Sequence, residues 1–173
     1  MAEKSIIGIE SVKMGDCGAD GTMGGTLSSI GLLVPGSVKM VWSETSKTEL
    51  YVEGTDTPYV SFPDTKRERT IELETRDADP ATLASIFGGS VSLDKWSAPT
   101  SESPKEQSVE LTSKSVGGYH YVIQVPRALV RASMDAPFSA EDSANIKVVF
   151  DILLPLDASS QPLPPITVEK ITE

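Results

Sequence analysis

The sequence has one cysteine, one histidine and few aromatic residues, and these shortages exclude several classes of protein. Cys17 has no second cysteine to pair with, so no disulfide within the chain stabilises the fold. Aromatic residues make up only 6% of the chain, so the core must rely on Val, Ile and Leu, which suits β-strands. No apolar run approaches the roughly 20 residues of a membrane-spanning helix. The N-terminus lacks the pattern of a secretory signal, and we expect a soluble, intracellular protein with no membrane contact.

Basic residues are also scarce, and this bears on nucleic-acid binding. The chain has 15 Lys and Arg against 25 Asp and Glu, a formal net charge of -10. Neutralising a phosphate backbone requires clusters of Lys and Arg, so we expect no specific binding of nucleic acid. One short cluster, Lys66, Arg67 and Arg69, lacks the interleaved aromatic residues that stack on bases. A salt bridge between subunits fits this cluster better.

No group of residues in the sequence has the pattern of a catalytic site. His120 lies in an alternating segment, which favours a structural position over a nucleophilic pair with Cys17. Glu72 and Glu74 are two residues apart, the usual spacing of a solvated strand face. A glycosidase pair is disfavoured there because no aromatic sugar platform accompanies it. We therefore expect a protein that is not an enzyme and that binds no cofactor.

Residues 15–25 form a glycine-rich segment, with Asp16, Gly18, Asp20, Gly21, Gly24 and Gly25 as its characteristic residues. The alternate aspartates resemble a calcium loop, but Leu27 stands where the bidentate glutamate belongs. The Lys-Ser/Thr pair of a phosphate-binding loop is also missing. We expect no metal site but a flexible loop, which becomes ordered when it contacts a neighbouring subunit or ring.

The clearest local signal is a short helix over about 80–88. Asp79 is a natural N-cap, Pro80 suits the first helical position, and Gly88 provides the left-handed exit. Between them lies an apolar stripe of three side chains, Leu83, Ile86 and Phe87.

Almost every other segment has the pattern of a strand or a loop. Strands are predicted over 5–14, 26–34, 37–42, 47–53, 69–76, 91–93, 108–115, 119–125, 128–134 and 146–154, with one more in the tail. In the 69–76 strand, Ile71, Leu73 and Thr75 share one face, and Glu72 and Glu74 lie on the other.

Many strands with one helix predict a mainly β fold, a sandwich or barrel of packed antiparallel sheets with a single flanking helix. We expect one domain over 1–173, with flexible loops at about 15–25 and 95–107. A C-terminal extension over about 157–173 carries the last strand, which is open to pairing with a neighbouring chain. Trp42 and Trp96 are expected to serve packing or an interface.

Two blocks of sequence carry a resemblance to a known family. The first is TKRERTIELETRDADPATLASIFGG, a polar strand followed by a capped helix, and the second is YHYVIQVPRALVRASMDAPFSAEDSANIKVVFDIL. In this order they resemble the major tail tube proteins of long-tailed bacteriophages and the tube proteins of contractile injection systems. The resemblance spans about 47–154.

The resemblance implies a structural virion protein that self-assembles into hexameric rings, which stack into a hollow tail tube, contractile or non-contractile. The chain's partners would be further copies of itself and other tail proteins, such as the tape measure, tail tip and terminator. Assembly would take place in the cytoplasm of the host bacterium. DNA would pass through an acidic lumen during ejection without specific binding, and Glu72 and Glu74 are candidates for facing the lumen or solvent.

Two other functions are weighed against this one. A ligand- or carbohydrate-binding β-sandwich module would need aromatic residues converging on a concave site, and the aromatic content is low for that. A hydrolase on a β-scaffold is disfavoured by the single histidine.

Overall fold

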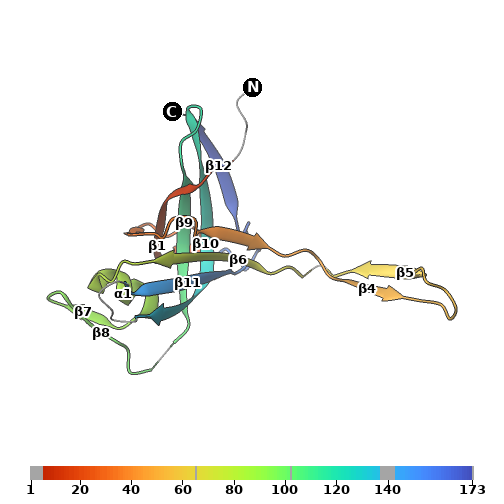
Figure 1. Ribbon diagram of the computed structural model, residues 1–173, viewed down its shortest axis with the longest axis horizontal. Helices are drawn as coiled ribbons and strands as arrows, with labels where there is room; N and C mark the ends of the chain where they lie inside the picture. Colours follow the sequence, from red (N-terminus) through yellow and green to blue (C-terminus); the bar gives the residue numbers. More distant parts are fainter. Residues whose placement is uncertain (1–5, 65, 102, 137–142, 173) are drawn as a thin grey trace.

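The chain folds around one large antiparallel sheet, seen in a computed structural model that describes residues 6–64, 66–101, 103–136 and 143–172 (Figure 1). Strands account for 50% and helix for 7%, which confirms the prediction of a mainly β fold. The strand order is β2-β1-β9-β10-β11-β6-β3, and β12 also pairs with β10. These strands are β1 (Ile9–Asp16), β2 (Ser28–Ile30), β3 (Lys39–Trp42), β6 (Arg69–Thr75), β9 (Lys105–Ser113), β10 (Tyr119–Asp135), β11 (Asn145–Ile152) and β12 (Thr167–Thr172).

Four smaller pieces complete the described structure. The hairpin of β4 (Lys47–Leu50) and β5 (Val60–Pro63) extends from the body, and a second hairpin joins β7 (Ser90–Ser92) to β8 (Lys95–Ser97). The α-helix α1 (Pro80–Phe87) packs near the second hairpin, and a 3-10 turn, η1, covers Ala19–Gly21.

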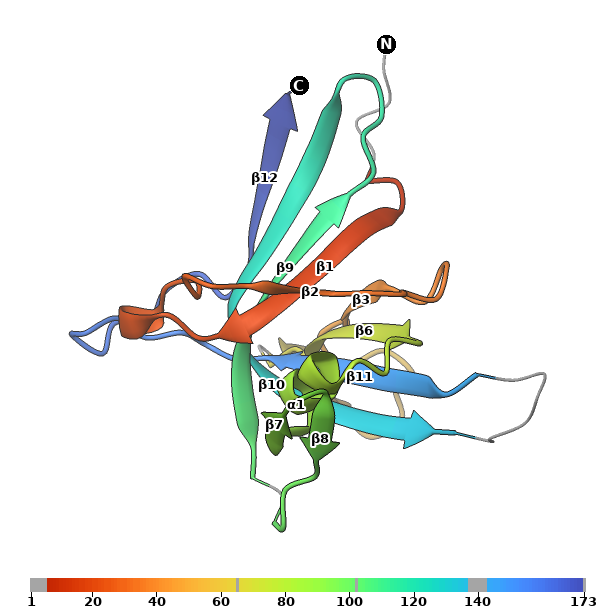
Figure 2. The same cartoon turned by 90° about the vertical axis from the view of Figure 1, so that its left-hand side faces the viewer.

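The long strand β10 belongs to both halves of the sheet because it changes partners along its length. Its first part pairs with β12 and β9, and its second part pairs with β9 and β11 (Figure 2). The register on β9 shifts between Val125 and Ala128, where Pro126 and Arg127 stand opposite Ser108 alone. This is a β-bulge, the position in a sheet interior where proline is tolerated.

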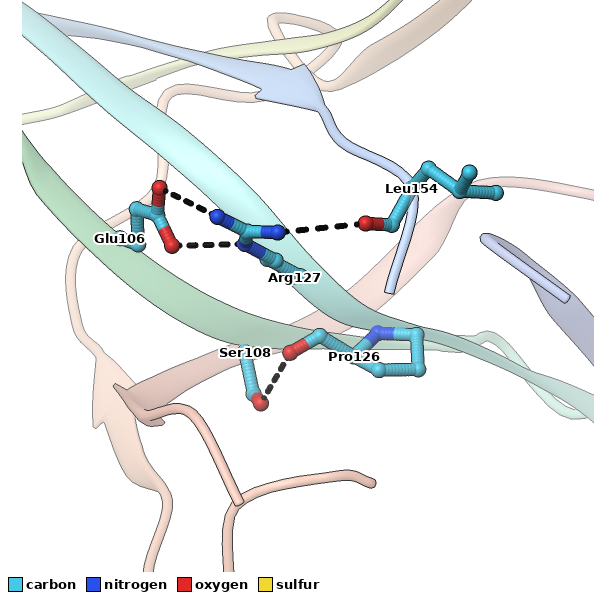
Figure 3. Close-up of polar contacts among 5 residues, drawn as sticks. All are labelled: Glu106, Ser108, Pro126, Arg127 and Leu154. Atoms are coloured by element: carbon cyan, nitrogen blue, oxygen red, sulfur yellow. Dashed lines mark hydrogen bonds and ion pairs between the residues drawn. The ribbon is translucent and has the colours of Figure 1, made fainter. Parts of the chain in front are cut away.

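Side chains stabilise the bulge where the ladder is interrupted (Figure 3). Ser108 Oγ donates to the carbonyl oxygen of Pro126 at 2.7 Å. Arg127 donates to both carboxylate oxygens of Glu106, at 2.6 and 2.9 Å, and to the carbonyl of Leu154 at 3.3 Å. These contacts connect β9, β10 and the segment after β11 at one point.

The sheet curls toward a barrel because one segment joins its two ends. Ile30 of β2 pairs with Val12 of β1, and three residues later Leu33 forms a bridge to Thr75 of β6. Two backbone bonds flank that bridge, from Val34 N to Glu74 O at 2.9 Å and from Arg76 N to Leu32 O at 3.0 Å. The same segment therefore contacts β1 on one side and β6 on the other, as the predicted sandwich or barrel requires.

The core lies inside this curl and is aliphatic. Fully buried side chains alternate along the long strands, and they include Val12, Met14, Ile71, Leu73, Val109, Leu111, Val125, Ile146, Val148 and Phe150. The predicted inward face of β6 is confirmed, since Thr75 is buried together with Ile71 and Leu73.

The helix matches its prediction closely. Asp79 accepts a hydrogen bond from Ala81 N at 3.0 Å, Pro80 begins the helix, and Gly88 ends it with φ of 77°. Leu83 and Ile86 are buried and Phe87 packs on the core, so the predicted stripe covers it. Gly89 is required by close approach, because a Cβ there would lie 2.2 Å from the carbonyl oxygen of Ser97.

Several segments differ from the prediction. The interval 95–107, expected to be a loop, contains β8 and the start of β9, and the two strands predicted over 119–134 are a single strand. The predicted strand at 26–34 is regular only over Ser28–Ile30, and β5 was not predicted. The last strand pairs with β10 of its own chain. The expected start of the first strand at Ser5 lies outside the described residues.

Candidate functional site

The hairpin of β4 and β5, called here the arm (residues 47–63), carries five exposed large hydrophobic residues, Leu50, Tyr51, Val52, Tyr59 and Phe62. It projects from the body at the end of β3 (Figure 1). Backbone bonds order it along its length, from Asp64 N to Ser46 O at 2.6 Å and from Tyr59 N to Leu50 O at 2.7 Å. Another, from Thr55 N to Val52 O at 3.1 Å, shapes the tip. The arm is a regular ribbon that extends away from the rest of the chain.

The two faces of the arm differ in polarity. Leu50 stands opposite Val60, and Thr48 stands opposite Phe62, so these four side chains share one face. Leu50 is 53% exposed and Phe62 is 55% exposed. Val60 between them is half-buried, so the exposed apolar area of this face comes from Leu50 and Phe62.

The opposite face is polar and internally paired. Lys47 forms an ion pair with Glu49, and Tyr51 Oη donates to the same carboxylate at 2.6 Å. The hydrogen bond from Lys47 holds the pKa of Glu49 below its ordinary value, and the pair raises the pKa of Lys47. A ribbon with one satisfied polar face and one bare apolar face is suited to binding another surface.

The predicted basic cluster lies at the root of the arm. The guanidinium of Arg69 lies over the ring of Trp42, 4.5 Å from its centroid. Lys66 N donates to Asp64 Oδ1 at 3.0 Å, which turns the chain from the arm into β6. Trp42 is half exposed, whereas Trp96 packs against Phe87 and donates to the Gly88 carbonyl at 2.8 Å.

Two long edges of the sheet are also open among the described residues. Strand β3 pairs only with β6, and β12 pairs only with β10. All six residues of β12 are exposed. Such edges carry unpaired backbone groups that can accept a further strand.

The predicted lumen candidates lie on the outer face of β6, in a mixed electrostatic setting. Glu72 Oε2 lies 3.1 Å from Lys39 Nζ and 3.7 Å from Lys147 Nζ, and the bond from Lys39 holds its pKa below the ordinary value. Glu74 follows on the same face, and Arg131 pairs there with Asp151. Acidic and basic side chains are interspersed on this face, so it does not present a single sign of charge.

The glycine-rich segment packs against the bulge of β10. Gly24 N donates to Ser108 Oγ at 2.9 Å, and a Cβ on Gly24 would lie 2.1 Å from the carbonyl oxygen of Asp16. Gly21, at φ of 69°, lies against the backbone of Leu156. Partial burial raises the pKa of Cys17 here, and His120 lies in the part of β10 that pairs with β12. Of the remaining characteristic residues, Asp16 ends β1, Gly18 and Asp20 belong to η1 and its N-cap, and Gly25 lies at a bend before β2.

Metal-ligand clusters and membrane-spanning helices are both absent from the described ranges. No group of three or more His, Cys, Asp or Glu side chains there is arranged to hold a metal ion. None of the helices within these ranges has both the length and the apolar character to cross a bilayer. A scan against protein-family models matches no family, and a search of curated proteins finds no similar sequence.

The arm is the feature that the sequence reading missed. The sequence predicts only its first strand, over 47–53, although Gly54 and Pro58 mark a turn after it. The alternation of Val60 and Phe62 after that turn is the signal that indicates the second strand.

Proposed function

We propose that this chain is a structural subunit that assembles with copies of itself into closed rings, stacked as the hollow tail tube of a long-tailed bacteriophage. The observation that carries the proposal is the arm, on which Leu50 and Phe62 are exposed on the same face as the half-buried Val60. An isolated two-stranded hairpin is only marginally stable in water. A neighbouring subunit that covers this face would stabilise the ribbon and bury its apolar side chains.

The open strands β3 and β12 support the same proposal. Strand β3 ends the strand order, whereas β12 lies outside that order and pairs with β10, so the β3 edge of one copy can meet a different edge, β12, of the next. Contacts between unlike surfaces produce rings when the rotation closes and filaments when it does not. A ring also removes the edges that expose a monomer to aggregation.

The charge distribution bears on how DNA would pass. The chain carries a net charge of -10, which repels phosphate, but the outer face around Glu72 is balanced by Lys39 and Lys147. In the proposed tube this face of β6 would therefore contribute little net repulsion of DNA. In the proposed tube the partners are other copies, together with tape measure, tip and terminator proteins, and the particle forms in the host cytoplasm.

Electron microscopy and light scattering of the full chain test the proposal, at high concentration and with a tail initiator present. Leu50→Ser removes an apolar side chain from the arm and should abolish rings or tubes while leaving the melting temperature of the monomer unchanged. Leu93→Ser is the matched control, because Leu93 is 96% exposed on the other hairpin. A wild-type protein that stays monomeric under all these conditions contradicts the proposal, as does equal assembly of the two variants.

A further inference from the structure

The body of the chain carries an apolar groove that the fold leaves open. It has a volume of about 710 Å³ and lies between the start of β1, the segment after β2 and the start of β3. Its apolar wall is formed mainly by Ile6, Ile9, Leu32, Leu33, Val34 and Val38. Leu32 is 71% exposed and has a φ of 48°, so a strained backbone holds an apolar side chain outward.

One charged residue of the groove has the sign that an acidic partner requires. The lining contains Glu10, Lys39 and Lys114; Lys39 is paired with Glu72, whereas Lys114 has no ion-pair partner within the described ranges. The tip (residues 51–59) carries Glu53 and Asp56 and no basic residue. It also presents Tyr51, Val52 and Tyr59 as exposed apolar surface. An acidic, apolar tip thus matches an apolar groove with a lysine at its side.

The position of the groove argues against binding of the arm of the same chain. Lys39 and Met40, at the start of β3, line the groove. The arm leaves from the other end of β3, beyond Trp42, and points away from the body (Figure 1). Arm and groove are therefore two unlike surfaces at opposite ends of one strand, which is the geometry of a head-to-tail contact.

We infer that the groove receives the arm tip of a second copy of this chain. The inference rests on the proposed self-assembly and adds the surface that accepts the arm. Tyr51, Val52 and Tyr59 of one copy lie against Leu32 and Val34 of the next, with the carboxylates of the tip near Lys114.

Disulfide trapping tests the inference in full chains that carry Cys17→Ser. One protein carries Tyr59→Cys and a second, tagged protein carries Leu32→Cys, and the two are mixed and oxidised. Docking raises the local concentration of the two thiols, so this mixture should give at least about tenfold more mixed dimer than a control mixture. The control replaces Leu32→Cys by Leu93→Cys, another exposed leucine with positive φ, 46°, on the other hairpin.

The outcomes separate the inference from the proposed function. Equal amounts of mixed dimer from Leu93→Cys and Leu32→Cys would contradict docking of the arm tip in the groove. So would the absence of mixed dimer from Leu32→Cys while rings still form. Neither result would contradict the proposed self-assembly. A single chain that carries both Tyr59→Cys and Leu32→Cys is oxidised at high dilution as a further test. If the two cysteines form a disulfide within the monomer, the chain's own arm occupies the groove and the inference is wrong. Absence of both trapping and any oligomer overturns the inference and the proposed function together.

Discussion

Arg127 binds Glu106 through two parallel hydrogen bonds, Nε to Oε2 at 2.6 Å and Nη2 to Oε1 at 2.9 Å, at the point where β10 bulges. The same guanidinium reaches the carbonyl of Leu154 through Nη1. One side chain thus connects β9 and β10 to the segment that follows β11, which is why the bulge has a defined geometry.

Replacing this guanidinium should weaken the fold modestly. Lysine cannot form the two-pronged bond, so we expect Arg127→Lys to lower the free energy of unfolding by about 0.5–1 kcal/mol, measured by urea denaturation. The control is Arg131→Lys, because Arg131 also pairs with a carboxylate, Asp151, but on regular strands without a third contact. A loss as large in the control would show that the link to Leu154 adds nothing.

The same pair predicts a pH dependence. The hydrogen bond from Arg127 lowers the pKa of Glu106 below its ordinary value of 4.5. A carboxyl with a lowered pKa in the folded state contributes stability above its unfolded pKa and loses it as pH falls through the folded pKa. The stability difference between wild type and Glu106→Gln should therefore be constant near neutral pH and shrink below about pH 4.5. Urea denaturation across this range measures it, and a difference that grows on acidification would contradict it.

Ser108 should contribute strongly to the stability of the fold, because its hydroxyl forms hydrogen bonds with two backbone groups. It donates to Pro126 O and accepts from Gly24 N, so Ser108→Ala leaves both without this partner. We expect a loss of about 1–3 kcal/mol, with faster exchange of the Gly24 amide. Ser28→Ala, at an exposed position of β2, is the control and should change stability by less than about 0.5 kcal/mol. An unchanged Gly24 amide in Ser108→Ala would show that the glycine-rich segment does not depend on this bond.

The helix cap gives a more local prediction. Asp79→Ala removes the acceptor of the Ala81 amide and should cost about 1 kcal/mol, seen as a lower melting temperature. Asp79→Asn keeps an acceptor at the same place and should retain most of the stability. Equal losses in the two variants would assign the effect to the charge and not to the cap.

Local signals explain what the sequence predicted correctly. The helix is defined by neighbours in sequence, Asp79 with Pro80 at one end and Gly88 at the other, and all three act as expected. The faces of β6 follow from strict alternation, which places Ile71 and Leu73 inside.

The errors fall where partners distant in sequence decide the structure. Pro126 interrupts the pattern of β10, yet the strand continues, because β9 and β11 flank it and Ser108 supplies a bond to the bulge. The polar, proline-rich interval 95–107 forms the start of β9 because its residues pair with the second part of β10. The second strand of the arm has only four residues and ends at Pro63, so the alternation of Val60 and Phe62 is its one sequence signal.

The pairing of β1 with β9 has a consequence for the time course of synthesis. Asp16 pairs with Gln107 and Ile9 with Ser113, so among the strands described β1 has only the three residues of β2 as a partner until β9 leaves the ribosome. At roughly 5–20 residues per second this delay lasts several seconds. A nascent chain therefore presents β1 and the arm together for several seconds before β9 is there to pair with β1.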